Sequence, residues 1–404
     1  NQSPTNHNAM KHHILSAVAT TATILSMCLC GNPASAQEAL GYRTIGNSPV
    51  TGDDGSTTFG VYAPNAGRVS VTGQIPGSPV DMSRDANGWW SVKIDSLKPE
   101  LYSYWFDIDG VRTLDPANAY VVRDIASLAS MFIMPGNRQT DLYSAHEVPH
   151  GNVAKVWYHS PTLAKDRRMT VYTPAGYDAD ESSRYPVLYL LHGMGGDENA
   201  WSELGRAVQI LDNTIAAGMA EPMIVVMPNG NAGEAAAPGE TAEGLYTPDG
   251  QRSLSPEGLF ENSFPEIVAY VDSHYRTKAD KANRAIAGLS MGGGHSWRIS
   301  MQYPDMFDYV GLFSAAVMWN GGGVAGQNAN PYDQALTRQF ATAPQLYWIA
   351  IGKDDFLYAL NASYRETLDR LGISYTYVET DGGHEWRNWR SYLVRFLPQL
   401  FKKE

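Results

Sequence analysis

The sequence predicts an α/β fold with a doubly wound, mostly parallel sheet, preceded by a small all-β, immunoglobulin-like sandwich. Three observations predict this arrangement. Short alternating stretches separated by turn residues fill residues 37–135, whereas apolar strand candidates alternate with helical stretches from residue 152 onward. One of the later strands runs into Gly-x-Ser-x-Gly, a motif that turns sharply from strand to helix. A chain of 404 residues with 43% hydrophobic residues can bury a large core and is long enough for two domains.

The first 36 residues predict a secretory signal peptide. Lys11 precedes an apolar run over residues 14–29, and Ala34-Ser35-Ala36 supplies a small-residue cleavage site, with cleavage after Ala36. The apolar run is too short for a membrane span, so we expect a secreted or periplasmic protein.

Both cysteines, Cys28 and Cys30, lie in this leader, so the mature chain is expected to have neither a disulfide nor a thiol nucleophile. Lipid attachment at Cys28 is the alternative, but Met27 before it is bulkier than lipoprotein processing usually accepts. The formal net charge of −12 disfavours nucleic acid and anionic membrane surfaces as partners.

The segment 37–135 contains the strand candidates of the sandwich. Asp109-Gly110 separates two apolar runs and predicts a tight hairpin turn. Trp89 and Trp90 are neighbours in one strand and point to opposite faces, so at least one of them is expected in the core. The predicted strands cover residues 57–62, 68–71, 89–94 and 101–108.

The polar segment 136–151 is predicted to link the sandwich to a second domain over residues 152–404. Strand candidates in this domain are continuous apolar runs, which is typical of a parallel sheet covered on both faces. The long Gly/Ala/Pro-rich stretch 231–258 is interpreted as a loop near the site, a lid or an ordinary surface insertion. The strand candidates cover residues 187–191, 223–227, 285–287 and 346–351, and the helical stretches cover residues 264–275 and 364–371.

Ser290, at the centre of the Gly-x-Ser-x-Gly motif, is the predicted nucleophile of an α/β-hydrolase site. The flanking glycines keep Cβ atoms out of the crowded turn and leave the hydroxyl exposed. A serine hydroxyl is a weak nucleophile, so it needs a base and a third group that orients the base. Asp354 or Asp355, and then His384, follow in the order Ser, Asp, His that this fold uses. Because side chains alternate near a strand end, only one of the two aspartates is expected to face the histidine.

The tetrahedral intermediate of acyl transfer also needs two main-chain N–H donors. Met291 follows the nucleophile, and Met194 lies among glycines after an early strand, so these two residues are the predicted oxyanion donors. His192 beside that turn is predicted to make a structural hydrogen bond. Three tryptophans are candidates to line an acyl pocket, namely Trp319, Trp386 and Trp389.

The sequence predicts neither a metal ion nor an organic cofactor. The mature chain is expected to contain no cysteine, and no His-x-x-x-His pair falls on a predicted helix. The triplets Gly292-Gly293-Gly294 and Gly321-Gly322-Gly323 lack the Lys-Ser/Thr ending of a phosphate-binding loop.

These motifs together resemble carbohydrate esterase family one, particularly bacterial feruloyl esterases and the broader esterase D group. The acid of that family precedes a Phe-Leu or Ser-Leu pair, which implies Asp355 rather than Asp354, and the family's oxyanion donors correspond to Met194 and Met291. The N-terminal segment is similar to family-48 carbohydrate-binding modules, here interpreted as a packing and positioning domain ahead of a sugar-binding one. The matching runs are 189–196, 227–230, 288–293, 352–357 and 382–386.

The resemblance implies a serine esterase that removes feruloyl and other hydroxycinnamoyl groups, with feruloylated arabinoxylan or its oligosaccharides as substrate. Removal of acetyl groups from xylan is the nearest alternative. A siderophore esterase of the enterobactin type is disfavoured by the signal peptide. A non-catalytic carbohydrate-binding protein is disfavoured by the complete set of Ser290, Asp355 and His384.

Overall fold

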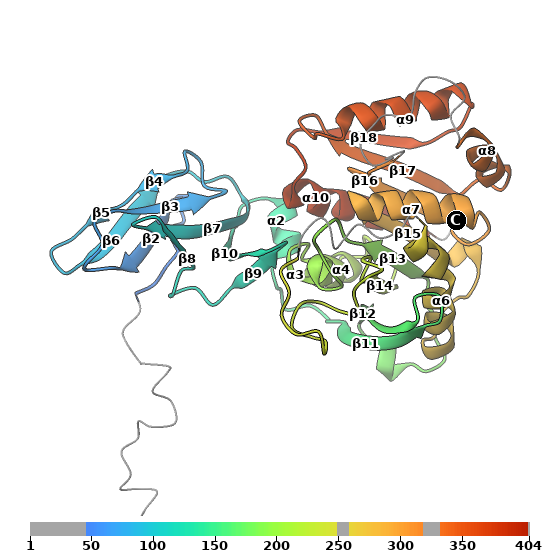
Figure 1. Ribbon diagram of the computed structural model, residues 1–404, viewed down its shortest axis with the longest axis horizontal. Helices are drawn as coiled ribbons and strands as arrows, with labels where there is room; N and C mark the ends of the chain where they lie inside the picture. Colours follow the sequence, from blue (N-terminus) through green and yellow to red (C-terminus); the bar gives the residue numbers. More distant parts are fainter. Residues whose placement is uncertain (1–45, 249–257, 318–331, 403–404) are drawn as a thin grey trace, which may run out of the picture. The chain divides into compact units, whose positions relative to one another are not determined.

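The computed structural model describes residues 46–248, 258–317 and 332–402, and residues Asn47–Glu404 form one compact unit (Figure 1). The predicted signal peptide, its two cysteines and Trp319 lie outside the described residues.

The first part of this unit is a β-sandwich, as the sequence predicts. One sheet has the strand order β1 (Val50–Thr51), β2 (Thr57–Tyr62), β6 (Trp89–Ile94) and β5 (Ser83–Arg84). The other has the order β4 (Val80–Asp81), β3 (Val69–Gly73), β7 (Glu100–Ile108), β10 (Ser127–Met134) and β9 (Val121–Asp124), and β8 (Val111–Thr113) pairs with β7.

Aromatic side chains fill the space between the two sheets. Phe59 of β2 meets Tyr104 of β7 edge to face, with ring centroids 4.9 Å apart. Trp90 is buried in this core and its indole N–H donates to the Ala63 carbonyl, whereas Trp89 is only half-buried and lies against Tyr62 on the outer face. The two tryptophans of β6 therefore lie on opposite faces, as the period of a strand requires.

The predicted hairpin turn at Asp109-Gly110 is also present. Asp109 and Gly110 have φ of +51° and +86°, and they connect β7 to the antiparallel β8. Two consecutive positive φ values favour Asp followed by Gly in a two-residue hairpin, because their twist matches that of the strands.

The second part is an eight-stranded sheet with helices on both faces (Figure 1). Its order is β11 (Asn152–Ser160), β12 (Lys165–Thr173), β14 (Ile224–Pro228), β13 (Val187–Leu191), β15 (Arg284–Leu289), β16 (Tyr309–Phe313), β17 (Leu346–Gly352) and β18 (Thr376–Thr380). From β14 to β18 every neighbouring pair is parallel, whereas β12 is antiparallel to both of its neighbours. This is a doubly wound, mostly parallel α/β-hydrolase sheet, as predicted.

Two apolar cores lie on the two faces of this sheet. Tyr189 and Leu191 of β13 face one core, and Leu188 and Leu190 face the other, so the continuous apolar strand serves both. The first core includes residues of α6 (Leu259–His274), α7 (Met291–Gln302), α8 (Asp333–Ala341) and α9 (Tyr358–Arg370). The second includes residues of α3 (Ala200–Glu203), α4 (Ala207–Ala216) and α10 (Trp386–Phe396).

The polar segment between the two parts contains a helix that the sequence analysis missed, α2 (Arg138–Tyr143). Asn137 and Thr140 form a capping box at its start, and Tyr143 is fully buried in the second core. That core also contains Leu101 and Val122 of the sandwich. Six residues are too few to show a clear helical period, which explains why the pattern did not predict α2. The boundaries 37–135, 136–151 and 152–404 stay predictions.

In the described part of the chain, no helix combines the length and hydrophobicity needed to cross a membrane.

Candidate active site

Ser290 lies at the turn between β15 and α7 in a backbone conformation that is rare for a residue with a side chain. Its φ is +54° and its ψ is −117°. Local packing holds this strained turn in place: a Cβ atom on Gly288 would lie 2.9 Å from Leu191 Cβ, and one on Gly292 would lie 2.5 Å from the Leu191 carbonyl oxygen. The two glycines of the motif are thus required by the close approach of β13 to the start of α7.

Asp355 and His384 form a hydrogen-bonded pair after the ends of β17 and β18. The Nδ1 atom of His384 lies 3.0 Å from Oδ1 and 2.9 Å from Oδ2 of Asp355, whose side chain is fully buried. Asp354, in contrast, is exposed. The structure therefore brings Asp355, and not its neighbour, to the imidazole.

The environment of Asp355 favours its ionised form. Burial by itself would raise the pKa of this carboxyl, but the hydrogen bonds from His384 and from the Leu357 main chain outweigh burial and lower the pKa below its ordinary value. A charged carboxylate at Nδ1 holds the imidazole with its proton on that nitrogen, which leaves Nε2 able to accept a proton.

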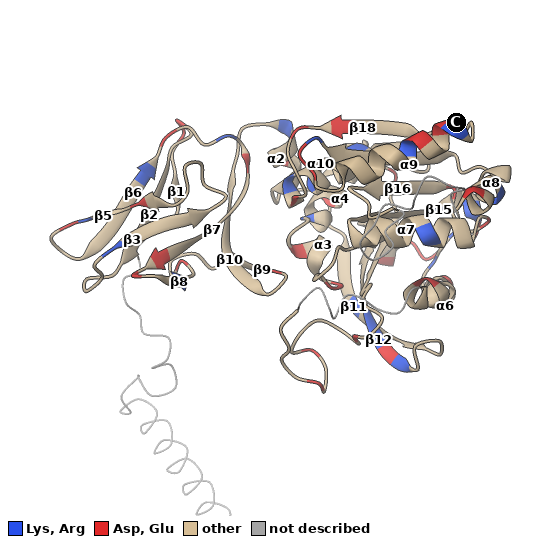
Figure 2. Ribbon diagram, turned by 45° about the horizontal axis from the view of Figure 1, so that its top comes forward, with Lys and Arg blue, Asp and Glu red and all other residues tan. Residues whose placement is uncertain are grey.

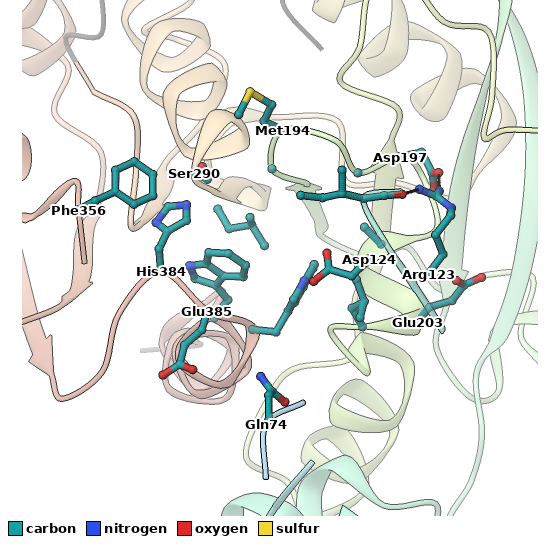
Figure 3. Close-up of a pocket in the computed structure, with 18 residues that line it drawn as sticks. Gln74, Arg123, Asp124, Met194, Asp197, Glu203, Ser290, Phe356, His384 and Glu385 are labelled. Atoms are coloured by element: carbon teal, nitrogen blue, oxygen red, sulfur yellow. Dashed lines mark hydrogen bonds and ion pairs between the residues drawn. The ribbon is translucent and has the colours of Figure 1, made fainter. Parts of the chain in front are cut away.

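Ser290 and His384 line the same pocket, whose volume is about 320 Å³. Figure 3 shows the imidazole of His384 pointing toward Ser290. The pocket thus contains a serine hydroxyl and an imidazole that a buried carboxylate orients, which are the groups that general-base activation of a hydroxyl requires.

The two predicted oxyanion donors lie beside the nucleophile. Met291 is the first residue of α7, a position whose N–H has no acceptor within the helix. Met194 is in the turn after β13, where a Cβ atom on the preceding Gly193 would lie 3.3 Å from Ser290 Cβ. Met194 and Met291 thus belong to two segments that meet beside Ser290, so both stay candidates for the oxyanion donors.

His192 holds the start of this turn. The ring is buried, its Nδ1 lies 2.7 Å from the Gly193 carbonyl oxygen, and its Nε2 accepts a hydrogen bond of 2.7 Å from the Gly230 N–H. Burial lowers the pKa of His192 to about 4, so the ring is neutral near pH 7. Its contacts are structural, as predicted.

Three aromatic side chains from the described part of the chain line the pocket. Trp386 and Trp389 both line it, with ring centroids 5.2 Å apart, and Trp389 meets His384 edge to face at 4.9 Å. Phe356 was not among the predicted site residues. Its ring is 71% exposed and its centroid lies 4.4 Å from that of His384. The third predicted tryptophan, Trp319, lies outside the described residues.

The sandwich also contributes to this pocket, which the sequence analysis did not anticipate. Gln74, Arg123, Asp124 and Ile125 line it together with Ser290 (Figure 3). No local pattern marks these residues, because they come from separate segments of the sandwich: Gln74 follows β3, whereas Arg123, Asp124 and Ile125 lie at the turn between β9 and β10.

Residues 231–248, the described part of the candidate lid before residue 249, are held by buried charged groups. Arg167 donates to the Asn231 carbonyl oxygen at 2.9 Å, and Glu198 accepts from the Ala237 N–H at 3.0 Å. Arg168 bridges Glu198 and Glu240. The residues that line the pocket do not include any of 231–248.

Residues 160–400, more than half of the chain, match the family model described as "Putative esterase". The chain belongs to this esterase family. Residues 40–120 of the esterase match the model of carbohydrate-binding module 48, the isoamylase N-terminal domain.

The esterase is 30% identical over 360 residues to an endo-1,4-beta-xylanase/feruloyl esterase of Xylanibacter ruminicola, covering 88% of this chain and 46% of that protein. The chain thus spans less than half of that relative's length. It is 25% identical over 283 residues to an acetyl esterase of Caldicellulosiruptor saccharolyticus, covering 62% of this chain and 98% of the relative. Among solved structures, a CE1 ferulic acid esterase of the anaerobic fungus Anaeromyces mucronatus has 26% identity and a TM-score of 0.53, covering 70% of this chain and 97% of that one.

The matches therefore assign the chain to an esterase family, and its eight-stranded sheet has the α/β-hydrolase fold. Within the described ranges, no group of three or more His, Cys, Asp or Glu side chains could hold a metal ion.

Proposed function

We propose that this esterase removes feruloyl and related hydroxycinnamoyl groups from plant cell-wall arabinoxylan through an acyl-enzyme on Ser290. The observation that carries the proposal is one pocket in which Ser290, the His384–Asp355 pair and aromatic walls meet. The 30% identity to a xylanase/feruloyl esterase and the likeness to a ferulic acid esterase support the same substrate class.

In the first step, the Ser290 hydroxyl oxygen attacks the ester carbonyl while Nε2 of His384 takes the hydroxyl proton. The carbonyl oxygen becomes an oxyanion, which the N–H groups of Met194 and Met291 stabilise. Asp355 stays ionised and stabilises the imidazolium that forms.

The tetrahedral intermediate then collapses. The bond between the acyl carbon and the sugar oxygen breaks, and His384 gives its proton to that oxygen, so the sugar leaves with a free hydroxyl. In the second step, His384 takes a proton from water, which attacks the acyl-enzyme. The proton returns to Ser290 as the carboxylic acid leaves, so the enzyme is regenerated.

Aromatic walls favour an aromatic acyl group over an acetyl group. Trp386, Trp389 and Phe356 offer ring faces and edges against which a cinnamoyl ring can pack, at about 0.5–1.5 kcal/mol for each aromatic pair beyond the buried area. Similarity to an acetyl esterase keeps acetyl release as the second candidate.

The test compares the products released by purified enzyme from methyl ferulate, methyl p-coumarate, acetylated xylan and feruloylated arabinoxylan, with Ser290→Ala as the control. We expect ferulate and p-coumarate from the wild type and neither from Ser290→Ala. Release of acetate alone would overturn the proposal. A Ser290→Ala variant as active as the wild type would reject Ser290 as the nucleophile.

We also propose that the enzyme is exported to the periplasm or the medium, with cleavage after Ala36. The sequence pattern of residues 11–36 supports this, and a polymeric substrate requires contact outside the cytoplasm. Mass spectrometry of the exported protein is expected to give an N-terminus at Gln37. Retention of the intact chain in the cytoplasm would contradict export.

A further inference from the structure

The tip of the β9–β10 hairpin is fixed to the esterase part of the chain by an ion pair with a buried carboxylate. The Arg123 guanidinium is paired with Asp197, whose side chain is almost fully buried, and it also donates to the Ile125 carbonyl oxygen at 2.6 Å. Asp197 in turn accepts from the Asn199 N–H at 2.9 Å. Because these contacts join the hairpin turn to the loop after β13, the hairpin occupies a defined place at the pocket.

Ile125 at the turn also contacts the loop that carries Met194. A Cβ atom on Gly195 would lie 2.8 Å from Cγ2 of Ile125, and Gly195 has a φ of +78°. The sandwich residue therefore packs directly onto the backbone that follows the proposed oxyanion donor. The position of the hairpin and the position of this loop depend on one another.

Asp124 lies between Arg123 and Ile125 in the chain and points into the pocket from the side opposite His384 (Figure 3). Asp124 is an exposed residue. Partial desolvation of its carboxyl at the pocket nevertheless raises the pKa, and a hydrogen bond from the Trp386 side chain and the charge of Arg123 oppose that rise. A carboxylate has about four lone-pair sites, so one indole donor leaves acceptor capacity for a bound molecule.

The charges around the pocket select what this carboxylate can bind. Asp124, Glu203 and Glu385 line the pocket, and among the described residues the lining includes one arginine and no lysine. This arginine, Arg123, is paired with Asp197. An anionic substituent would meet repulsion here, whereas a neutral hydroxyl is a suitable donor to a carboxylate.

We propose that Asp124, supplied by the N-terminal sandwich, accepts a hydrogen bond from a neutral hydroxyl of the substrate and thereby helps to determine specificity. This inference rests on the proposed function, since it names a feature of the ester bound at the same site. Two hydroxyls have the required chemistry: the phenol of a hydroxycinnamoyl group, and a hydroxyl of the sugar that carries it. The sandwich then forms part of the substrate pocket.

The experiment measures kcat/KM of the full chain with three esters. Methyl ferulate and methyl 3,4-dimethoxycinnamate differ in the phenolic donor, and feruloyl arabinose differs from methyl ferulate in the sugar. The variants are Asp124→Ala, Asp124→Asn, which keeps a neutral acceptor of the same size, and Asp95→Ala, which removes an exposed carboxylate of the same sandwich. Thermal unfolding of each variant reports on folding, and Asp124→Asn serves if Asp124→Ala does not fold.

Two selectivity ratios are taken from the kcat/KM values: methyl ferulate over methyl 3,4-dimethoxycinnamate, and feruloyl arabinose over methyl ferulate. For Asp124→Ala we expect one of these ratios to fall about 10-fold or more, because a hydrogen bond to a charged group contributes about 1.5–3 kcal/mol. If the variant loses the preference for methyl ferulate over methyl 3,4-dimethoxycinnamate, the phenol is the donor. If it loses the preference for feruloyl arabinose over methyl ferulate, a sugar hydroxyl is the donor. Asp124→Asn is expected to lose less in the same ratio, and Asp95→Ala is expected to leave both ratios unchanged. Unchanged ratios in both Asp124 variants, including equal losses on all three esters, would overturn the inference. A wild type that does not hydrolyse methyl ferulate or feruloyl arabinose would instead reject the proposed function, and the inference with it.

Discussion

Replacement of Asp355 by asparagine tests the proposed role of this carboxylate in orienting His384 most directly. Asp355 accepts from His384 at 2.9 and 3.0 Å and from the Leu357 N–H at 2.9 Å. Asparagine preserves the size of the side chain and keeps one oxygen for Leu357. Its amide nitrogen then faces Nδ1 of His384, and because both groups are donors, the imidazole is expected to move its proton to Nε2. In that tautomer the ring has no lone pair for the proton of Ser290.

The expected loss of kcat follows from the negative charge that the substitution removes. At 2.9 Å and an effective dielectric constant of about 20, a carboxylate stabilises an imidazolium by about 6 kcal/mol. Each 1.36 kcal/mol changes a rate about tenfold, so the upper bound on the loss of kcat is a factor of about 10⁴. We expect kcat of Asp355→Asn to fall by about 10³ to 10⁴-fold with a much smaller change in KM.

The chain supplies its own control in Asp354. This neighbour is exposed, so Asp354→Asn removes the same charge without touching the imidazole. Its kcat is expected to stay within about threefold of the wild type. The assay is initial-rate hydrolysis of methyl ferulate, with thermal unfolding to confirm that both variants fold. Losses of similar size in the two variants would refute the assignment of Asp355.

Three further outcomes are expected. Gly292→Ala places a methyl group 2.5 Å from the Leu191 carbonyl oxygen, so denaturant unfolding should show a loss of about 1–3 kcal/mol together with lower activity; an unchanged free energy of unfolding would contradict the packing argument. Burial would raise the pKa of Glu261, but its interaction with His295 lowers it from 4.5 to about 2. That shift stabilises the folded state by about 3 kcal/mol above pH 4.5, and the contribution disappears as the pH falls toward 2. The stabilities of wild type and Glu261→Gln should therefore converge in acid, and a difference independent of pH would refute the linkage. Phe356→Ala should leave the free energy of unfolding within about 0.5 kcal/mol, because the ring is 71% exposed, while kcat/KM for methyl ferulate falls by about 2- to 10-fold. An unchanged kcat/KM would exclude a role for the ring in the pocket.

Features set by short stretches of chain could be predicted from the sequence. Apolar runs located strands such as β13 and β17, and the spacing of two glycines around Ser290 located the turn at the end of β15. The Asp-Gly hairpin was predicted for the same reason, since two residues determine its backbone conformation. Each signal depends on residues within a few positions of one another, so no tertiary contact is needed to read it.

The tertiary structure decided which side chains meet at the pocket. Alternation left Asp354 and Asp355 equivalent, and the family resemblance implied Asp355; only the packing of β17 beside β18 buries Asp355 against His384 and exposes its neighbour. The contribution of the sandwich was not predictable, because Arg123 and its partner Asp197 are 74 positions apart. Such contacts depend on the complementarity of two distant surfaces, which no periodicity of residue types records. The sequence by itself therefore determined the fold and the order of the reacting groups, whereas the structure decided that the N-terminal sandwich forms one wall of the active-site pocket.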